Sequence, residues 1–318
     1  MKPPPPSGKE TNTTPSSQSE MTIQQTLELA AEHHIQGRLP QAEHLYVKVL
    51  QKDPNQVDAI HMLGLIAHQV GKNNIAVELI SKAIEQRPGW AEAHSNLGAA
   101  LQHLGRLEEA LANFEKAILL NPNFADAYHN HGVGLHDLGR FSEAIISFER
   151  AIQLKRDSAD LYVDLGYTLR ELGKFTEAVP VYQRALTIDP THLVANRNLG
   201  LTYRDLGQLD NALKLFKSTD NQEFQSHILE CLFTLGEYDR FYETLNHSLA
   251  IYGTNIRAAA ISAFASQQLG RPNPHPFCKN PLDFVRTYEL LNGISKQDEL
   301  LGDLISCVGS MDAIWEPL

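Results

Sequence analysis

The chain has 318 residues, of which 42% are hydrophobic and 20% charged, and its formal net charge is -11. This composition is typical of a globular protein with one large or two ordinary domains. The negative charge argues against general nucleic-acid binding and against docking on an anionic membrane, because both require a basic surface.

Residues 1–21 are rich in Pro, Ser and Thr, which predicts a disordered tail. The tail lacks the apolar stretch of a secretion signal, and no run in the sequence approaches the roughly 20 apolar residues of a membrane span. We therefore expect a cytoplasmic protein. The three cysteines, Cys231, Cys278 and Cys307, form no C-x-x-C pair. This pattern indicates reduced thiols or small buried side chains rather than disulfides or a zinc site.

Between residues 22 and 226 one pattern returns six times, always at the interval that separates Gly37 from Gly71. A glycine column consists of Gly37, Gly71, Gly105, Gly139, Gly173 and Gly207. An alanine column consists of Ala42, Ala76, Ala110, Ala144, Ala178 and Ala212. A column of large side chains consists of Tyr46, Ile80, Phe114, Phe148, Tyr182 and Phe216. Several columns in one register predict stacked repeats that share a continuous core.

Each repeat is predicted to be a pair of helices, as residues 91–124 illustrate. Apolar residues three and four positions apart indicate a first helix, which ends at Gly105 because a glycine permits the chain to turn there. A second apolar stripe predicts a second helix that Pro122 ends. We expect Phe114, on that second helix, to fill space against the next repeat.

These columns resemble the small-and-large packing pattern of the tetratricopeptide repeat family. The resemblance implies an all-α fold, a right-handed superhelical α-solenoid of helix-turn-helix repeats in which the first helices line the concave side. It covers six repeats within residues 22–226, followed by degenerate repeats in 227–271. Gly236 follows Gly207 at a shorter interval than the one between the earlier glycines, which predicts a shortened helix between them.

Residues 272–318 are predicted to break the repeat pattern. Three prolines in residues 272–276 exclude a helix there. Capping signals then predict helices over about 281–291 and 296–308, which would cover the open end of the stack. Because an apolar Trp315 stands near the end with no predicted element around it, we also expect this segment to be the truncated start of a further region.

The stretch 280–286 is similar to a junction in bacterial repeat proteins that continue into a 2-oxoglutarate and iron oxygenase-like region. Such an enzyme requires two histidines and one carboxylate as metal ligands. No histidine follows His275, so the ligands of an enzyme of this kind would lie beyond this chain.

A polar column on the first helices is the first candidate for partner binding. Asn96, Asn130 and Asn198 share one repeat position with Asp164. The column resembles the asparagine ladder in the repeat region of O-GlcNAc transferases, which implies contacts with the peptide backbone of a client. Amides suit this role because they both donate and accept hydrogen bonds. Glu28, Met62 and Asp164 depart from that pattern. The alternative is that these amides solvate the helix face or bond a neighbouring loop.

Two further columns supply imidazole and guanidinium groups to the same predicted groove. The candidate residues are His61, His129 and Arg197 in one column, and His68, His136, Arg170 and Arg204 in the other. Arginine suits partner carboxylates or phosphates. The alternative for Arg170 and Arg204 is ion pairing between repeats. His61 and His68, like His129 and His136, lie seven residues apart, which is about 10 Å along a helix and unsuited to one metal ion. We therefore predict no metal and no cofactor.

No nucleotide-binding, metalloprotease or nucleophile motif occurs in the sequence, so we predict no enzyme activity in this chain. The leading hypothesis is a scaffold that binds a peptide or partner protein in the concave groove. One alternative is the substrate-recruiting arm of a larger enzyme, a protein O-glycosyltransferase or an oxygenase, with its catalytic domain outside this chain. Another is a purely structural part of an assembly, for which the ends or the convex face would carry the contacts.

Overall fold

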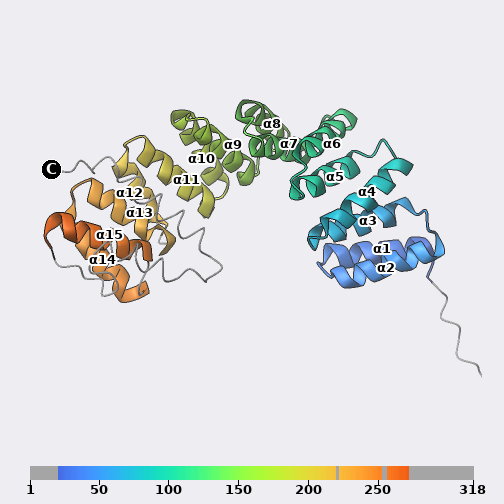
Figure 1. The fold of residues 1–318 in the computed structure, drawn as a ribbon, viewed down its shortest axis with the longest axis horizontal. Helices are drawn as coiled ribbons and strands as arrows, with labels where there is room; N and C mark the ends of the chain where they lie inside the picture. The colour runs from blue at the N-terminus through green and yellow to red at the C-terminus, as the bar shows by residue number, and fades with distance from the viewer. Residues whose placement is uncertain (1–20, 220–221, 253–255, 272–318) are drawn as a thin grey trace, which may run out of the picture. The chain divides into compact units, whose positions relative to one another are not determined.

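The computed structural model describes residues 21–219, 222–252 and 256–271. Within these ranges every regular element is helical, which confirms the predicted all-α repeat fold (Figure 1). The chain divides into two compact halves, Met1–Asn130 and His131–Leu318, each of which is described by itself. The boundary falls inside helix α7, Ala125–Asp137.

The helices alternate between a first and a second helix of each repeat. The first helices are α1 (Ile23–Ile35), α3 (Val57–Gln69), α5 (Ala91–His103), α7 (Ala125–Asp137), α9 (Ala159–Glu171), α11 (Leu193–Asp205), α13 (Gln225–Thr234) and α15 (Ile256–Leu269). The second helices are α2 (Leu39–Lys52), α4 (Asn73–Gln86), α6 (Leu107–Leu120), α8 (Phe141–Leu154), α10 (Phe175–Ile188), α12 (Leu209–Ser218) and α14 (Tyr238–Tyr252). A short 3-10 helix, Gln222–Phe224, precedes α13.

The glycine column forms the turn inside each repeat. Gly105 has a φ of 73°, a conformation that costs a glycine little because it has no Cβ. Its N–H donates to the carbonyl of Gln102, and the N–H of Arg106 donates to the carbonyl of Leu101, at 2.9 and 3.0 Å. These bonds use carbonyls that the end of α5 would otherwise leave unpaired. The other five glycines of the column, with Gly236 and Gly270, also have positive φ.

The alanine column and the column of large side chains form the buried interior of the repeats. All members of both columns are at most 1% exposed. The ring of Phe114 packs directly over Gly98 of the same repeat, where a Cβ would lie 2.5 Å from the ring. The pairs Gly132 with Phe148, Gly166 with Tyr182 and Gly200 with Phe216 repeat this contact. The glycine on the first helix therefore admits the large side chain of the second.

Two features break the regularity of the second helices. Helix α12 has 10 residues, whereas α10 has 14, which confirms the shortening predicted from the glycine spacing. Pro180 lies inside α10, which nonetheless continues to Ile188. Pro40 lies at the start of α2, where its missing N–H is not needed.

Several predicted features lie outside the described residues. They are residues 1–20 of the predicted tail, the predicted capping helices within 272–318, and two of the cysteines, Cys278 and Cys307. The third cysteine, Cys231, is buried and makes no disulfide. Burial raises the pKa of its thiol to about 11, so the thiol is protonated at neutral pH and behaves as a small apolar side chain.

Candidate partner-binding surface

The candidate surface is formed by first helices that lie side by side. In the N-terminal half α3 contacts α5, and in the C-terminal half α9 contacts α11 and α13 contacts α15. Residues that share a repeat position therefore fall in line across neighbouring first helices. We call the outward side of these helices, within each half, the first-helix surface.

Asn96 and Asn130 each reach back to the preceding repeat. The Nδ2 atom of Asn96 donates to Nε2 of His61 at 3.1 Å, and that of Asn130 donates to Oγ of Ser95 at 3.4 Å. In both pairs the two partners are separated by one repeat length plus one residue. Each asparagine therefore bonds a residue of the preceding repeat that belongs to the neighbouring column. The amides are half-buried, and their side-chain oxygens keep acceptor capacity that a partner could use.

His61 lies beneath the surface rather than on it. Its side chain is only 4% exposed, and its ring packs against Trp90 at a centroid distance of 4.2 Å. Because Asn96 donates to Nε2, the proton of the neutral ring sits on Nδ1, which has no hydrogen-bond partner among the described residues. Burial lowers the pKa of His61 to about 4, against weaker opposing effects of Asp58 and Glu92. In this structure His61 holds the side chain of Asn96 in position. His61 itself would have to become exposed before it could contact a partner.

His68 and His136, the histidines of the second column, lie near the ends of their first helices. His68 donates from Nδ1 to Oδ1 of Asn73 at 2.7 Å, and its ring meets that of His103 edge to face at 4.8 Å. His136 lies between Phe141 and Tyr167, with ring centroids 5.1 and 5.2 Å away. These three rings pack within the scaffold while remaining partly accessible. His129 is also half-buried.

The arginines of the C-terminal half are held by the scaffold. Arg170 donates to Asp205 at 2.8 Å, and Arg204 donates to Glu230 at 2.9 Å. Both pairs join neighbouring repeats, so the structure shows the ion-pairing alternative for these two residues. Glu230 is only 9% exposed and is also 3.5 Å from Nδ1 of His227, so loss of Arg204 would remove a compensating charge from a poorly solvated carboxylate.

Arg197 differs from the two paired arginines. It is exposed and has no ion-pair partner among the residues that the structure describes. Among the predicted arginines it has the guanidinium best placed to meet a partner carboxylate. Asp164 and Asn198, on α9 and α11, are half-buried on the same surface.

Tyr182 is fully buried, as expected for the column of large side chains. It belongs to the column of large side chains, but its hydroxyl extends toward Arg170 and Asn198 of two first helices. Burial raises the pKa of Tyr182, and Arg170 opposes this rise. The sequence could have indicated this polar group, because Tyr182 carries a hydroxyl at the repeat position that phenylalanine occupies in Phe114, Phe148 and Phe216.

An apolar column on the first-helix surface was also missed. It consists of Ala31, Leu65, Ala99, Val133, Tyr167 and Leu201, each three residues after a member of the polar column. All are at least partly accessible to solvent, and Tyr167 is 41% exposed. The regular spacing was visible in the sequence, but apolar residues on an amphipathic helix are ordinarily assigned to the core.

Comparison with protein families identifies the repeats. A tetratricopeptide repeat model matches residues 91–124, and a second tetratricopeptide repeat model matches 123–191 and 157–219. Residues 91–219 are tetratricopeptide repeats. Helices α1 to α4 before them have the same lengths, the same glycine turns and the same alanine column. A search of curated proteins found no match.

Solved structures of tetratricopeptide repeat proteins give partial matches. The crystal structure of MamA is 29% identical, with a TM-score of 0.47, and the match covers 51% of this chain and 95% of MamA. YrrB, described as a TPR protein with an unusual peptide-binding site, is 26% identical, with a TM-score of 0.49 and coverage of 57% and 97%. The thermophilic TPR protein TTC0263 of Thermus thermophilus is 23% identical, with a TM-score of 0.49 and coverage of 57% and 98%. The finer resemblance to O-GlcNAc transferases gains no support from these matches.

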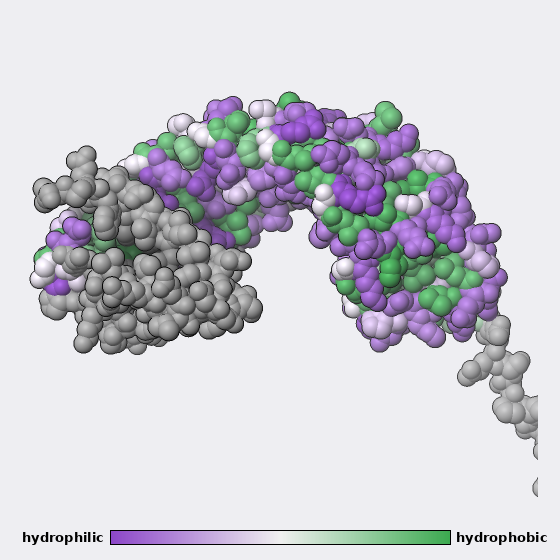
Figure 2. Space-filling view, viewed as in Figure 1, coloured by the Kyte–Doolittle hydropathy of each residue, from purple (hydrophilic) through white to green (hydrophobic). Residues whose placement is uncertain are grey.

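The residues that the structure describes show no group of three or more His, Cys, Asp or Glu side chains that could hold a metal ion. Over the same residues, no helix is long and apolar enough to span a membrane. Figure 2 shows hydrophobic side chains exposed among hydrophilic ones over helices α1 to α4.

Proposed function

We propose that the chain is an interaction scaffold that binds a peptide or partner protein along its first-helix surface. The observation that carries the proposal is the apolar column, which is flanked by amide and imidazole groups and returns in each of the six repeats. Partly exposed apolar side chains supply affinity when they are buried by a partner. The neighbouring amides, such as those of Asn96 and Asn130, fix the position of the bound backbone.

Two residues support the proposal in the C-terminal half. Tyr167 exposes a large aromatic ring, and aromatic side chains are enriched among residues that dominate binding energy. Arg197, three residues before Gly200 on α11, adds an exposed guanidinium. A partner segment with an apolar residue near a carboxylate would satisfy both.

Affinity capture from the native cell, with quantitative mass spectrometry, tests the proposal. The test variants are Tyr167→Ala and the triple variant Asn96→Ala, Asn130→Ala and Asn198→Ala. The matched controls are Leu119→Ala and Ile146→Ala, which remove side chains that are 71% and 66% exposed on the second helices α6 and α8. We expect partners to be lost from both test variants and kept by both controls.

Retention of every partner by both test variants would refute the proposal and favour a structural role carried by other surfaces. Circular dichroism of each variant confirms that the helices are intact. The predicted cytoplasmic location is a separate proposal, which cell fractionation of the native protein tests.

A further inference from the structure

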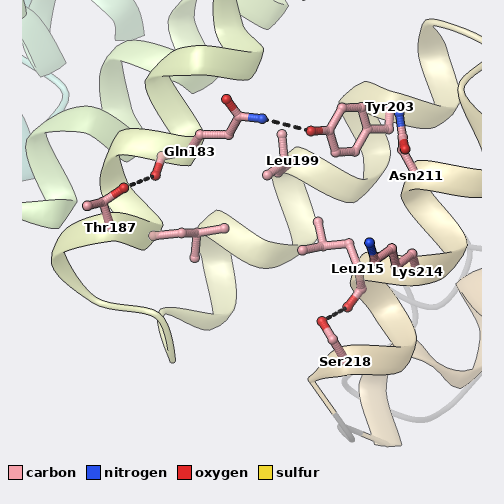
Figure 3. A pocket seen from close by; sticks show the side chains of 9 residues that line it. Gln183, Thr187, Leu199, Tyr203, Asn211, Lys214, Leu215 and Ser218 are labelled. Atoms are coloured by element: carbon pink, nitrogen blue, oxygen red, sulfur yellow. Dashed lines mark hydrogen bonds between the residues drawn. The ribbon is translucent and has the colours of Figure 1, made fainter.

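A groove opens on the second-helix side of the C-terminal half, between α10 and α12 (Figure 3). Its volume is about 470 Å³. The lining residues are Gln183, Leu186, Thr187, Leu199, Tyr203, Asn211, Lys214, Leu215 and Ser218. Leucine side chains from three helices form its apolar part, and polar groups surround them. None of these residues belongs to the columns that form the first-helix surface.

The groove lies beside the shortened helix α12. Leu186 lies near the end of α10, and the same position in the next repeat is position 220. Helix α12 ends at Ser218, before that position. One wall is fixed by a hydrogen bond of 2.9 Å from Nε2 of Gln183 to the hydroxyl of Tyr203.

Positive charge gathers at the α12 end of the groove. An adjoining hollow of about 490 Å³ shares Lys214 and Ser218 with it and adds Lys217 and Arg240, and Asp210 is the only acidic residue of its lining among those that the structure describes. Arg240 forms an ion pair with Glu237. Lys214 and Lys217 have no ion-pair partner in the described part of the chain. The whole chain has a net charge of -11, so this cluster of positive side chains is opposite in charge to the rest of the protein.

The surroundings of Lys217 also favour an anion. Burial lowers the pKa of its ammonium group, and the positive charge of Arg240 lowers it further, against the smaller opposing effect of Glu237. A carboxylate placed between these cations would relieve their mutual repulsion. Because the adjacent groove is apolar, the occupant that fits both parts is a peptide carrying an apolar side chain beside acidic residues.

We propose that this groove is a second interaction surface, which binds an acidic peptide segment of a partner protein. One large apolar side chain of that segment lies among Leu186, Leu199 and Leu215. Its carboxylates lie beside Lys214 and Lys217. The surface is independent of the first-helix surface, because it is built from α10, the buried side of α11 and α12.

Fluorescence polarisation with three labelled peptides of about twelve residues tests the proposal. The probe contains Asp and Glu around a central Leu-Phe pair, the second peptide replaces that pair by Ser-Ser, and the third replaces the acids by Lys. We expect the full chain to bind the probe saturably and the other two at least about tenfold more weakly. We expect the Kd for the probe to rise with added salt, because exposed charges are screened.

Lys214→Glu and Lys217→Glu are the test variants, and Lys82→Glu, on the exposed side of α4, is the matched control. All three lysines are exposed, so the fold should be retained, and circular dichroism verifies it. We expect the double variant Lys214→Glu with Lys217→Glu to raise the Kd for the probe at least about tenfold, while the control leaves it unchanged.

Three results would overturn the proposal. They are no saturable binding of the probe by the unaltered chain, equal binding of the lysine peptide, and equal losses in the test and control variants. Equal binding of the serine peptide would overturn the assignment of the leucines. Because the lysines lie outside the first-helix surface, the double variant should still capture the partners of that surface.

Discussion

Protonation of His61 should destabilise the N-terminal half as the pH falls. The ring is 4% exposed, packs against Trp90 and accepts a hydrogen bond from Asn96 at Nε2. Its pKa is lowered from 6.5 to about 4, first of all by burial. A second proton would have to occupy Nε2, where it would face the amide N–H of Asn96. The folded state therefore binds this proton more weakly than the unfolded state does.

The size of the effect follows from the two pKa values. Between pH 6.5 and 4 the unfolded chain takes up the proton and the folded chain does not, so stability falls as the pH decreases. A difference of about 2.5 pKa units corresponds to about 3 kcal/mol when the transition is complete, and to about 2 kcal/mol at pH 5. Above pH 6.5 the contribution is fully present and does not change with pH.

Urea unfolding at a series of pH values, followed by amide hydrogen exchange in α3 and α5, measures this dependence. Local exchange is needed because repeat arrays can unfold in parts. In the unaltered protein the free energy of unfolding should fall by about 2 kcal/mol between pH 7 and pH 5 because of His61. We expect His61→Gln to abolish this fall, and the matched control His103→Gln, at an exposed position, to retain it. A pKa of His61 above 6 in an NMR titration, or equal pH slopes in both variants, would refute the reasoning.

Two further changes probe the repeat contacts. Gly98→Ala places a Cβ 2.5 Å from the aromatic ring that packs over it, so overpacking of about 1–3 kcal/mol should exceed the helix-propensity gain of about 1 kcal/mol. Gly89→Ala, with nothing within 4 Å, should change the urea midpoint little, and equal midpoints for both variants would contradict this account. Arg204→Met should destabilise the C-terminal half by about 2 kcal/mol, because it removes the guanidinium that pairs with the poorly solvated carboxylate of Glu230, which His227 also faces at 3.5 Å. Arg197→Met is the control, and an equally large loss in that variant would show that the ion pair is not the cause.

The sequence was sufficient for the repeat architecture because each repeat depends on local rules and on its immediate neighbours. Gly105 needs a positive φ, Ala110 must be small, and Phe114 must be large, and each requirement acts within one helix pair. The same local rules revealed the shortened α12, since a reduced interval between Gly207 and Gly236 has a direct geometric meaning.

The candidate surface was only partly predictable. The columns correctly placed Asn96 and Arg170 on first helices, but spacing along the chain does not say which polar groups bond one another. His61 is buried because Trp90, from the next repeat, covers it. Arg170 is paired because Asp205 lies one repeat and one residue further on. Both outcomes depend on how neighbouring helices cross.

What the sequence determined by itself is therefore the fold of each repeat, because a constant repeat length with fixed small and large positions allows one way of pairing the helices. Only the tertiary structure decided which of the repeated polar side chains remain available. It also revealed the groove beside Lys214, because side chains of α10, α11 and α12 line it together. Contacts between helices set burial, and burial separates residues that hold the scaffold from residues that can meet a partner.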